Sequence, residues 1–309
     1  MGRIGPSPSH FVLPALLIPR PHCPRMAHMV YLNGRLVPAE QAVISVFDRG
    51  FLYGDGLFET VRVSQGRPFR WPAHWERFCR GLACLKLECP ASETELLEVI
   101  HQLVHANRVR EGILRVTLSR GSGARGYSPK SAKSPTLALS LSETVDSDSA
   151  RPLGWKLHTA AFVLPPANAL SAFKNANKLP QILARMEADE AGADEAIVRT
   201  ADGYAAEATS SSLFWIDTTG LCAPPLSLGG LPSVSRATVI EIAGQISLPF
   251  REALIRPAEL FESLGVFLST STHGIVEGLA LDGRSLPVNV LVTQLWQGYQ
   301  ARVRAETHE

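Results

Sequence analysis

Apolar and polar residues alternate along this chain with two periods, one typical of helices and one typical of strands. After the capping-box tetrad Ser92-Glu93-Thr94-Glu95, apolar residues stand at positions 96, 97, 99, 100, 103 and 104, which is helical spacing. Further helices are expected over residues 72–86, over 179–191 and from Pro232 to about Gly244. Strands are expected over residues 30–32, 35–37, 58–63, 113–118, 136–141, 156–163, 195–199, 205–216 and 266–271.

Two hairpins decide between the fold classes. Asn33-Gly34 separates the first two strands, and Asp202-Gly203 separates strand 195–199 from strand 205–216. Such dipeptides favour tight turns between antiparallel strands. The predicted order of elements contains no regular strand–helix–strand units of the kind that build doubly wound parallel sheets. The sequence therefore predicts an α+β fold in two mixed halves.

Shifts in composition divide the chain. Residues 1–28 hold six prolines and no acidic residue, so we expect a disordered extension there. An upstream start codon explains this stretch most simply, although Arg3 and the apolar octet 11–18 weakly resemble a secretory signal or transit peptide. We expect a small N-terminal domain over 29–145, a polar linker over 146–154 and a large domain over 155–309.

Composition excludes several classes of protein. The 309 residues are 45% hydrophobic and carry a net charge of +1, which gives no electrostatic reason to expect a nucleic-acid or membrane-surface partner. No apolar run has the length of a membrane span. The five cysteines lack CxxC spacing, so neither a disulfide framework nor a thiolate zinc site is indicated. We expect a cytoplasmic protein without a metal.

Lysine is scarce, and two of the six lysines precede a predicted helix. The chain has 24 arginines, whereas Lys174 and Lys178 stand together just before residue 179. Only the lysine amine can lose its proton and form a Schiff base. A solvated helix N-terminus is the simpler explanation of the same spacing.

Two segments are candidates for binding phosphate. Residues 48–56 are glycine-rich but lack a Walker lysine pattern. Residues 231–236 open a predicted helix, where free backbone N–H groups and the hydroxyls of Ser233 and Ser235 would meet an anion. Simple N-capping by these serines remains the alternative.

Five groups of residues together resemble the signature of the fold-type IV pyridoxal-phosphate enzymes, the class IV aminotransferases. They follow in the same order and at similar separations over about residues 30–300. The groups are Asp48-Arg-Gly with Gly54-Asp-Gly-Leu-Phe-Glu-Thr60, Arg62 and His74-Trp-Glu-Arg77; Phe173-Lys-Asn-Ala-Asn177; Gly203-Tyr-Ala-Ala-Glu-Ala-Thr-Ser-Ser-Ser-Leu-Phe214; Leu231-Pro-Ser-Val-Ser-Arg236; and Leu268-Ser-Thr-Ser-Thr272. The resemblance implies a smaller N-terminal α/β domain and a larger C-terminal domain with a barrel-like sheet.

The resemblance also implies pyridoxal 5'-phosphate as cofactor and assigns roles to particular residues. Lys174 would form the Schiff base and move the proton, and Glu207 would pair with the pyridine nitrogen. The cofactor phosphate would be held by Arg77, Val234, Ser235 and Ser271. The family usually has Asn at the position of Ser212, so one supporting hydrogen bond is in question.

One loop points to a branch of this family. Residues 120–128, Arg-Gly-Ser-Gly-Ala-Arg-Gly-Tyr-Ser, resemble a loop of the 4-amino-4-deoxychorismate lyases, which make 4-aminobenzoate and pyruvate. The residues expected to contact substrate are Phe58, Arg125 and Tyr127, with Thr60 assisting the leaving group. A D-amino acid or branched-chain aminotransferase using 2-oxoglutarate is the alternative, followed by a catalytically silent binding protein.

The resemblance implies a homodimer as well. Fold-type IV sites are built where two subunits meet, and the neighbour would supply part of the substrate loop. The expected partners are thus a small-molecule substrate and a second copy of the chain.

Overall fold

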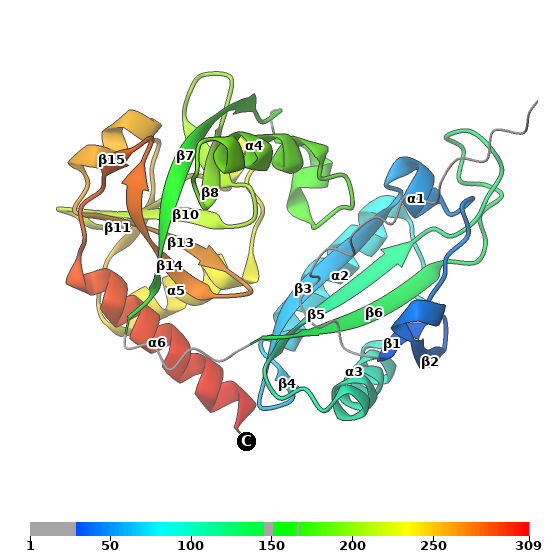
Figure 1. Cartoon of the computed structure of the whole chain (residues 1–309). Helices are drawn as coiled ribbons and strands as arrows, with labels where there is room; N and C mark the ends of the chain where they lie inside the picture. The colour runs from blue at the N-terminus through cyan, green and yellow to red at the C-terminus, as the bar shows by residue number, and fades with distance from the viewer. Residues whose placement is uncertain (1–28, 145–150, 166, 309) are drawn as a thin grey trace, which may run out of the picture.

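The computed structural model describes residues 29–144, 151–165 and 167–308. The chain forms two lobes, each built on its own sheet (Figure 1). The predicted extension 1–28 and most of the predicted linker lie outside the described residues. Leu153 and Gly154, also predicted as linker, instead begin the first strand of the second sheet.

The N-terminal lobe contains a six-stranded antiparallel sheet in the order β2-β1-β6-β5-β3-β4. Its strands are β1 (Met29–Leu32), β2 (Arg35–Pro38), β3 (Gly56–Ser64), β4 (Arg67–Pro68), β5 (Gly112–Ser119) and β6 (Thr136–Glu143). Helices α2 (Trp71–Leu85) and α3 (Glu93–Asn107) pack against one face, and α1 (Arg49–Tyr53) lies near one end. The predicted capping box at Ser92 is confirmed, because its hydroxyl accepts the Glu95 N–H and the Glu95 carboxylate accepts the Ser92 N–H.

Strand β3 separates the core of this lobe from the surface that faces the second lobe. Leu57, Val61 and Val63 are fully buried in the core beneath α2 and α3. Phe58 and Thr60 alternate with them and therefore lie on the opposite face. The register of the sheet places Arg115 of β5 directly opposite Thr60, so both side chains project from that same face.

The C-terminal lobe is built on a curled nine-stranded sheet. The order is β12-β11-β10-β13-β14-β7-β8-β9, with β15 paired to β14. Its strands are β7 (Leu153–Val163), β8 (Glu195–Arg199), β9 (Ala205–Ala208), β10 (Ser212–Asp217), β11 (Gly220–Ala223), β12 (Phe250–Glu252), β13 (Gly265–Thr270), β14 (Gly274–Leu281) and β15 (Arg284–Ser285). The helices are α4 (Leu179–Glu190), α5 (Val234–Gln245) and α6 (Val290–Thr307). Antiparallel and parallel pairs both occur, which confirms the α+β prediction.

One predicted strand is wrong. Residues 205–216 form two strands, because the chain turns at Thr209–Ser211 and β10 pairs with β13 instead of continuing beside β8. The Ala208 N–H donates to the carbonyl of Ser211 across this turn. The three turn hydroxyls all donate to the buried carboxylate of Glu195, which stabilises the break.

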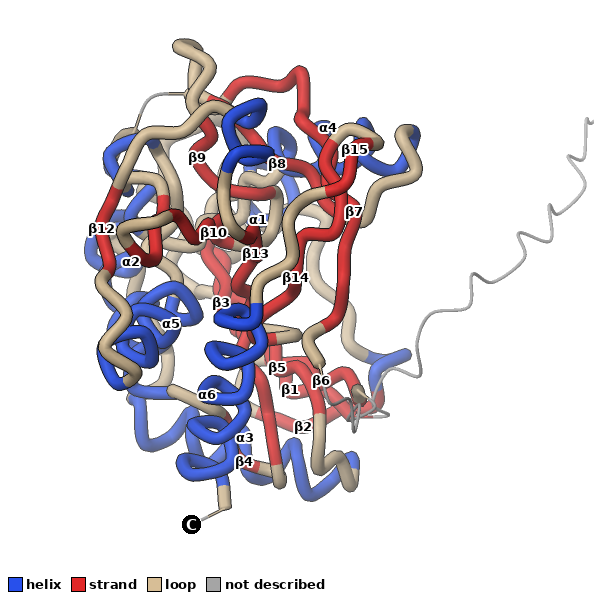
Figure 2. Tube along the Cα trace, turned by 90° about the vertical axis from the view of Figure 1, so that its left-hand side faces the viewer, coloured by secondary structure: helices blue, strands red, loops and turns tan. Residues whose placement is uncertain are grey.

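Helix α6 and the start of α2 join the two lobes. In Figure 2, α6 runs beside α5, and its contacts reach β3 of the N-terminal lobe. The rings of Phe69 and Tyr299 pack edge to face, with 5.8 Å between their centres. Arg70 forms ion pairs with Glu241 of α5 and with Glu306 of α6. No helix in the described part of the chain is long and apolar enough to cross a membrane.

Candidate active site

A cavity of about 530 Å³ lies where the two lobes meet. Both sheets contribute to its wall, and so do α2, α4 and the start of α5. Ten of the residues singled out in the sequence line it: Phe58, Thr60, Arg77, Lys174, Lys178, Glu207, Ser212, Ser233, Ser235 and Ser271. Val234 lies between Ser233 and Ser235 at the first turn of α5. The structure thus brings residues from each of the five groups to one place.

The segment that carries Lys174 is attached to the N-terminal lobe. The Phe58 N–H donates to the carbonyl of Lys174 at 2.9 Å, and the Ala176 N–H donates to the carbonyl of Gly56 at 3.0 Å. Phe173 is buried in the N-terminal core, so close to Gly81 that a Cβ there would come within 2.8 Å of its ring. These contacts fix the backbone on both sides of Lys174.

The environment of Lys174 lowers the pKa of its amine. Nζ lies 5.0 Å from the centre of the Phe58 ring. Burial and the nearby Arg77 guanidinium lower the pKa of Lys174 to about 8, although the carboxylates of Glu59 and Glu207 oppose this. A neutral amine is the nucleophilic form, so a useful fraction is reactive near neutral pH.

Glu207 is a buried carboxylate that lines the cavity from β9. Its Oε2 accepts the Leu231 N–H at 2.8 Å. Burial raises the pKa of Glu207 to about 6, against the effects of this hydrogen bond and of the Lys178 and Lys174 ammonium groups. A carboxylate with little hydration is suited to pair with a protonated ring nitrogen.

The start of α5 has the arrangement of a turn that can bind an anion, and is called the anion-binding turn below. The Ser233 hydroxyl caps the helix by accepting the Arg236 N–H at 3.0 Å. It also contacts the hydroxyl of Ser235 at 3.2 Å, and Ser269 donates to Ser235 at 3.3 Å. The first N–H groups of a helix have no partner inside the helix, and its dipole favours an anion there. Ser233 therefore serves as N-cap and also lines the cavity.

Ser212 keeps a polar contact at the position where Asn is usual. Its hydroxyl lies 2.8 Å from the hydroxyl of Ser233. The side chain thus supports the anion-binding turn from β10.

Arg77 lies beneath this turn in a fully buried charge cluster. It donates to Glu59 twice, from Nε at 2.8 Å and from Nη2 at 2.6 Å, and its Nη1 donates to the carbonyl of Pro232 at 3.3 Å. His74 Nδ1 lies 2.7 Å from the same carboxylate. Burial raises the pKa of Glu59, but Arg77 and His74 outweigh it and lower that pKa to about 2. The ion pair with Glu59 thus holds the Arg77 guanidinium against the start of α5.

Sequence reasoning assigned no role to Arg115. Its guanidinium lies 3.8 Å from the centre of the Phe58 ring, and no ion pair connects it to a carboxylate among the described residues. Burial lowers the pKa of Arg115. Only the pairing register of β3 with β5 reveals that this cation faces the cavity, and the register cannot be deduced from the alternation within β5 alone.

Arg125 and Tyr127 do not line the cavity of their own chain. They lie in the loop between β5 and β6, where Arg125 is exposed and the Tyr127 side chain is 87% exposed. Their predicted role therefore depends on a second copy of the chain. The glycine-rich stretch 48–56 also lies outside the cavity wall and forms α1 and the start of β3.

The polar groups that line the cavity match the functional groups of pyridoxal phosphate. The α5 turn and Arg77 offer amides, hydroxyls and a cation for a phosphate. Glu207 offers a carboxylate for a ring nitrogen, and Lys174 offers an amine for an aldehyde. All three kinds of group line one cavity, so the residues present match the functional groups of this cofactor.

Comparison with known proteins agrees with this geometry. The sequence profile of the family "Amino-transferase class IV" matches residues 56–280. The aminodeoxychorismate lyase of Bacillus subtilis is 33% identical over 230 residues, covering 72% of this chain and 76% of that protein. A protein of Methanocaldococcus jannaschii, provisionally named a branched-chain-amino-acid aminotransferase, is 29% identical over 259 residues, covering 82% and 88%.

A solved structure extends the likeness to the fold. The T.th. branched-chain amino acid aminotransferase with pyridoxamine 5'-phosphate has a TM-score of 0.83 and 26% identity, covering 91% of this chain and 95% of that one. The predicted fold-type IV architecture is thereby confirmed. With a family profile that matches most of the chain, this protein belongs to the class IV aminotransferase family.

Proposed function

We propose that this protein is a 4-amino-4-deoxychorismate lyase, which releases pyruvate and forms 4-aminobenzoate for folate synthesis. Its cofactor is pyridoxal 5'-phosphate. The observation that carries the proposal is the stretch Arg120–Ser128, whose sequence resembles a loop of the lyase branch. The 33% identity to the Bacillus subtilis aminodeoxychorismate lyase supports it.

The charge of the cavity suits the substrate. 4-Amino-4-deoxychorismate carries two carboxylates, one on the ring and one on the enolpyruvyl group. Besides Lys174 and Arg77, which we assign to the cofactor, the cavity wall contains the cations Arg115, Lys178 and Arg185, and only Arg185 of these three forms an ion pair among the described residues, with Asp189. A planar guanidinium can bind a carboxylate through two parallel hydrogen bonds, so Arg115 suits one of these groups.

The residues of the cavity divide the chemistry between them. When bound, the cofactor supplies an electron sink for the negative charge that develops on the substrate carbon bearing the amine. The neutral amine of Lys174 removes the proton from the amine-bearing carbon, and the carboxylate of Glu207 keeps a proton on the ring nitrogen. The bond between the ring carbon and the enolpyruvyl oxygen breaks, the substrate ring becomes aromatic, and the proton taken up by Lys174 passes to the enolpyruvate, which becomes pyruvate. Thr60, whose side chain lines the cavity, assists that oxygen.

An aminotransferase is the second candidate, acting on D-amino or branched-chain amino acids with 2-oxoglutarate. The Methanocaldococcus jannaschii relative and the T.th. structure favour it. It would use Lys174 and Glu207 in the same way, and 2-oxoglutarate also carries two carboxylates. The cavity alone therefore does not separate the two reactions.

We also propose that the chain is a homodimer in the cytoplasm. Two apolar surfaces are exposed, one on residues 43–52 and one on α4. They consist of Val43, Ile44, Val46, Phe47, Phe51 and Leu52, and of Leu179, Ile182, Leu183 and Met186. Exposed apolar surface of this extent is typical of protein interfaces. In the proposed dimer, the second copy supplies the loop that carries Arg125 and Tyr127.

Separate assays of the two reactions test the proposal. Purified protein loaded with cofactor is supplied with 4-amino-4-deoxychorismate, and in parallel with D-alanine or L-leucine plus 2-oxoglutarate. Formation of 4-aminobenzoate is measured by chromatography, because pyruvate alone would also arise from D-alanine. Turnover in the first assay is expected. Turnover only with an amino acid and 2-oxoglutarate would overturn the lyase assignment.

The assignment of the reactive lysine is tested without substrate. Borohydride reduction of the loaded protein and peptide mapping should place the tag on Lys174. A tag on Lys178 or Lys156 would contradict the position of the cofactor. The Lys174→Arg variant is the matched control and should carry no tag.

A further inference from the structure

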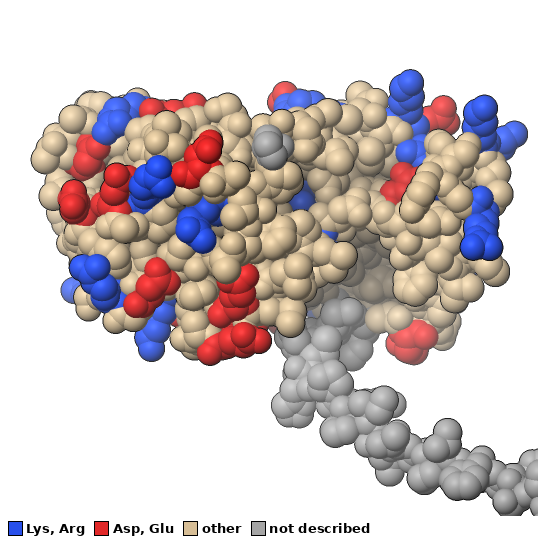
Figure 3. Space-filling model, turned by 90° about the horizontal axis from the view of Figure 1, so that it is seen from above, with Lys and Arg blue, Asp and Glu red and all other residues tan. Residues whose placement is uncertain are grey.

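The loop between β5 and β6 is positively charged and presents an aromatic ring to solvent. From Arg120 to Ser134 the chain has four Arg or Lys residues and no Asp or Glu. Arg125, Lys130 and Lys133 are exposed. Seen from above, Lys and Arg side chains lie at both ends of the molecule, including the end that carries α1 and this loop (Figure 3). The contacts that fix the backbone of this loop therefore determine the orientation of its side chains.

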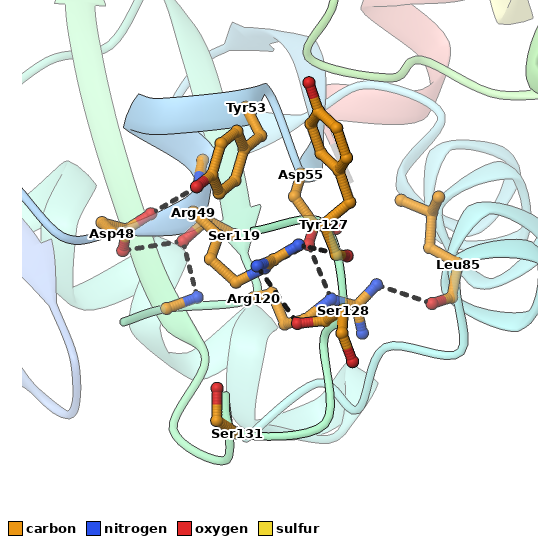
Figure 4. Close-up of polar contacts among 12 residues, drawn as sticks. Asp48, Arg49, Tyr53, Asp55, Leu85, Ser119, Arg120, Tyr127, Ser128 and Ser131 are labelled. Carbon is orange, nitrogen blue, oxygen red and sulfur yellow. Dashed lines mark hydrogen bonds and ion pairs between the residues drawn. The ribbon is translucent and has the colours of Figure 1, made fainter. Parts of the chain in front are cut away.

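One buried guanidinium holds that backbone. Arg49, the first residue of α1, is 3% exposed. Its Nη1 donates to the carbonyl of Gly126 at 2.8 Å and to that of Ser128 at 3.4 Å, and its Nη2 donates to the carbonyl of Tyr127 at 2.9 Å (Figure 4). Three consecutive carbonyls thus face one side chain. Gly126 has a φ of 105°, which favours glycine and lets the chain curl around the guanidinium.

Two further side chains keep the guanidinium in place. Asp55 accepts from Nε of Arg49 and from Nε of Arg120, each at 2.8 Å. Burial raises the pKa of Asp55, but these two arginines outweigh it and lower that pKa. Tyr53 lies with its ring centre 5.0 Å from Cζ of Arg49, and its hydroxyl accepts the Gly126 N–H at 3.1 Å.

The same turn is connected to the reactive segment. Asn177 donates from Nδ2 to the carbonyl of Gly54 at 3.0 Å, next to Asp55. A Cβ on Gly54 would come within 2.4 Å of Asn177, so the two segments are in direct contact. The loop is therefore fixed relative to the segment that carries Lys174.

We propose that Arg49 is a positioning residue, which fixes the backbone of 126–128 so that Arg125 and Tyr127 are presented to a carboxylate-bearing substrate in the site of a second copy of this chain. The substrate role rests on the proposed function and on the dimer. The hydrogen bonds from Arg49 to the three carbonyls, called the clamp below, are independent of both the proposed function and the dimer. Arg49 acts through the loop and does not line the cavity.

The clamp is tested by hydrogen exchange on the loaded, full-length protein. Arg49→Lys keeps a positive charge beside Asp55 but replaces the planar fork by a single ammonium group, which cannot reach three carbonyls together. We expect the peptide over 121–134 to exchange about tenfold faster, whereas the α3 peptide keeps its rate. Tyr53→Phe, which removes only the hydroxyl that accepts from Gly126, should give a smaller change in the same direction. Arg80→Lys is the control, since Arg80 forms an exposed ion pair with Glu76 on α2.

The substrate role is tested by kinetics on the same variants. Arg49→Lys should raise KM for the anionic substrate about tenfold and change kcat by less than about threefold, because binding contacts alone are lost. Arg125→Ala should reproduce this split, and Arg80→Lys should not. Faster exchange with an unchanged KM overturns the substrate role, and unchanged exchange overturns the clamp. If 4-amino-4-deoxychorismate is not turned over, the proposed function fails, and KM for 2-oxoglutarate is measured in its place.

Discussion

At the residue scale, the proposed mechanism depends on two ionisable groups of the cavity whose pKa values are shifted toward neutrality. The pKa of Lys174 is lowered to about 8 by burial and by Arg77, and the pKa of Glu207 is raised to about 6 by burial. Between these values Glu207 is ionised while a fraction of Lys174 is neutral. Both groups thus have the protonation states that the proposed mechanism requires over a window from about pH 6 upward.

Cofactor loading should therefore depend on pH. The rate at which added pyridoxal phosphate gains its protein-bound absorbance band should rise with pH and reach half its maximum near pH 8, because only neutral Lys174 reacts. The Lys178 ammonium also lowers the pKa of Lys174, so Lys178→Met should move the midpoint to higher pH. A midpoint that stays in place would contradict this coupling.

Glu207→Gln should separate binding from chemistry. The variant should still bind cofactor, but proton removal should slow by about a hundredfold, since a neutral amide no longer holds the ring nitrogen protonated. Stopped-flow absorbance measures both steps. Glu190→Gln is a matched control, because Glu190 is exposed at the end of α4. Equal turnover of wild type and Glu207→Gln would show that the assigned role is wrong.

The buried pair of Glu59 and Arg77 should give an acid-dependent contribution to stability. The pKa of Glu59 is lowered from 4.5 to about 2, so its contribution is complete above pH 4.5 and disappears as pH falls through 2. The size corresponds to about 3 kcal/mol. Urea unfolding of wild type and Glu59→Gln at pH 6 and pH 3 measures it. The difference between the two proteins should shrink at pH 3.

At the scale of elements, the start of α5 combines structural and binding roles. Ser233→Ala removes the acceptor for the Arg236 N–H and should cost about 1 kcal/mol of stability. It also removes the hydroxyl that joins Ser212 to Ser235, so phosphate-containing cofactor should dissociate more easily. Thermal melting and equilibrium dialysis measure the two effects. Ser233→Thr should retain most of both.

Elements with a local signal were predictable, and elements defined by distant partners were not. The Ser92 capping box and the Asn33-Gly34 hairpin appear as predicted, because neighbouring residues determine them. The strand predicted over 205–216 was wrong because Glu195, ten or more residues away, stabilises the turn within it. The same limit applies to the site, where β3–β5 register brings Arg115 to the cavity. Helix α6 was missed although Val292, Leu295, Tyr299 and Val303 follow helical spacing.

At the scale of the whole molecule, the exposed apolar surfaces predict self-association. Light scattering should give about twice the chain mass of 33.5 kDa. Phe47→Glu together with Phe51→Glu, at two side chains that are 66% and 69% exposed, should yield monomers with lower turnover. The exposed Val288→Glu is a control that should leave the mass unchanged. A fully active wild-type monomer would contradict the proposed dimer.

The attachment of the Lys174 segment to β3 has a consequence for how the protein unfolds. In sequence the segment belongs to the second half of the chain, yet Phe173 is part of the N-terminal core and the Lys174 carbonyl accepts from Phe58. The anion-binding turn and Glu207, by contrast, belong to the C-terminal lobe. A molecule held by both sets of groups ties the lobes together, and ligand that binds only the native state stabilises it. We therefore expect loading with cofactor to make the two lobes unfold as a single cooperative unit, so that calorimetry shows one transition with cofactor bound.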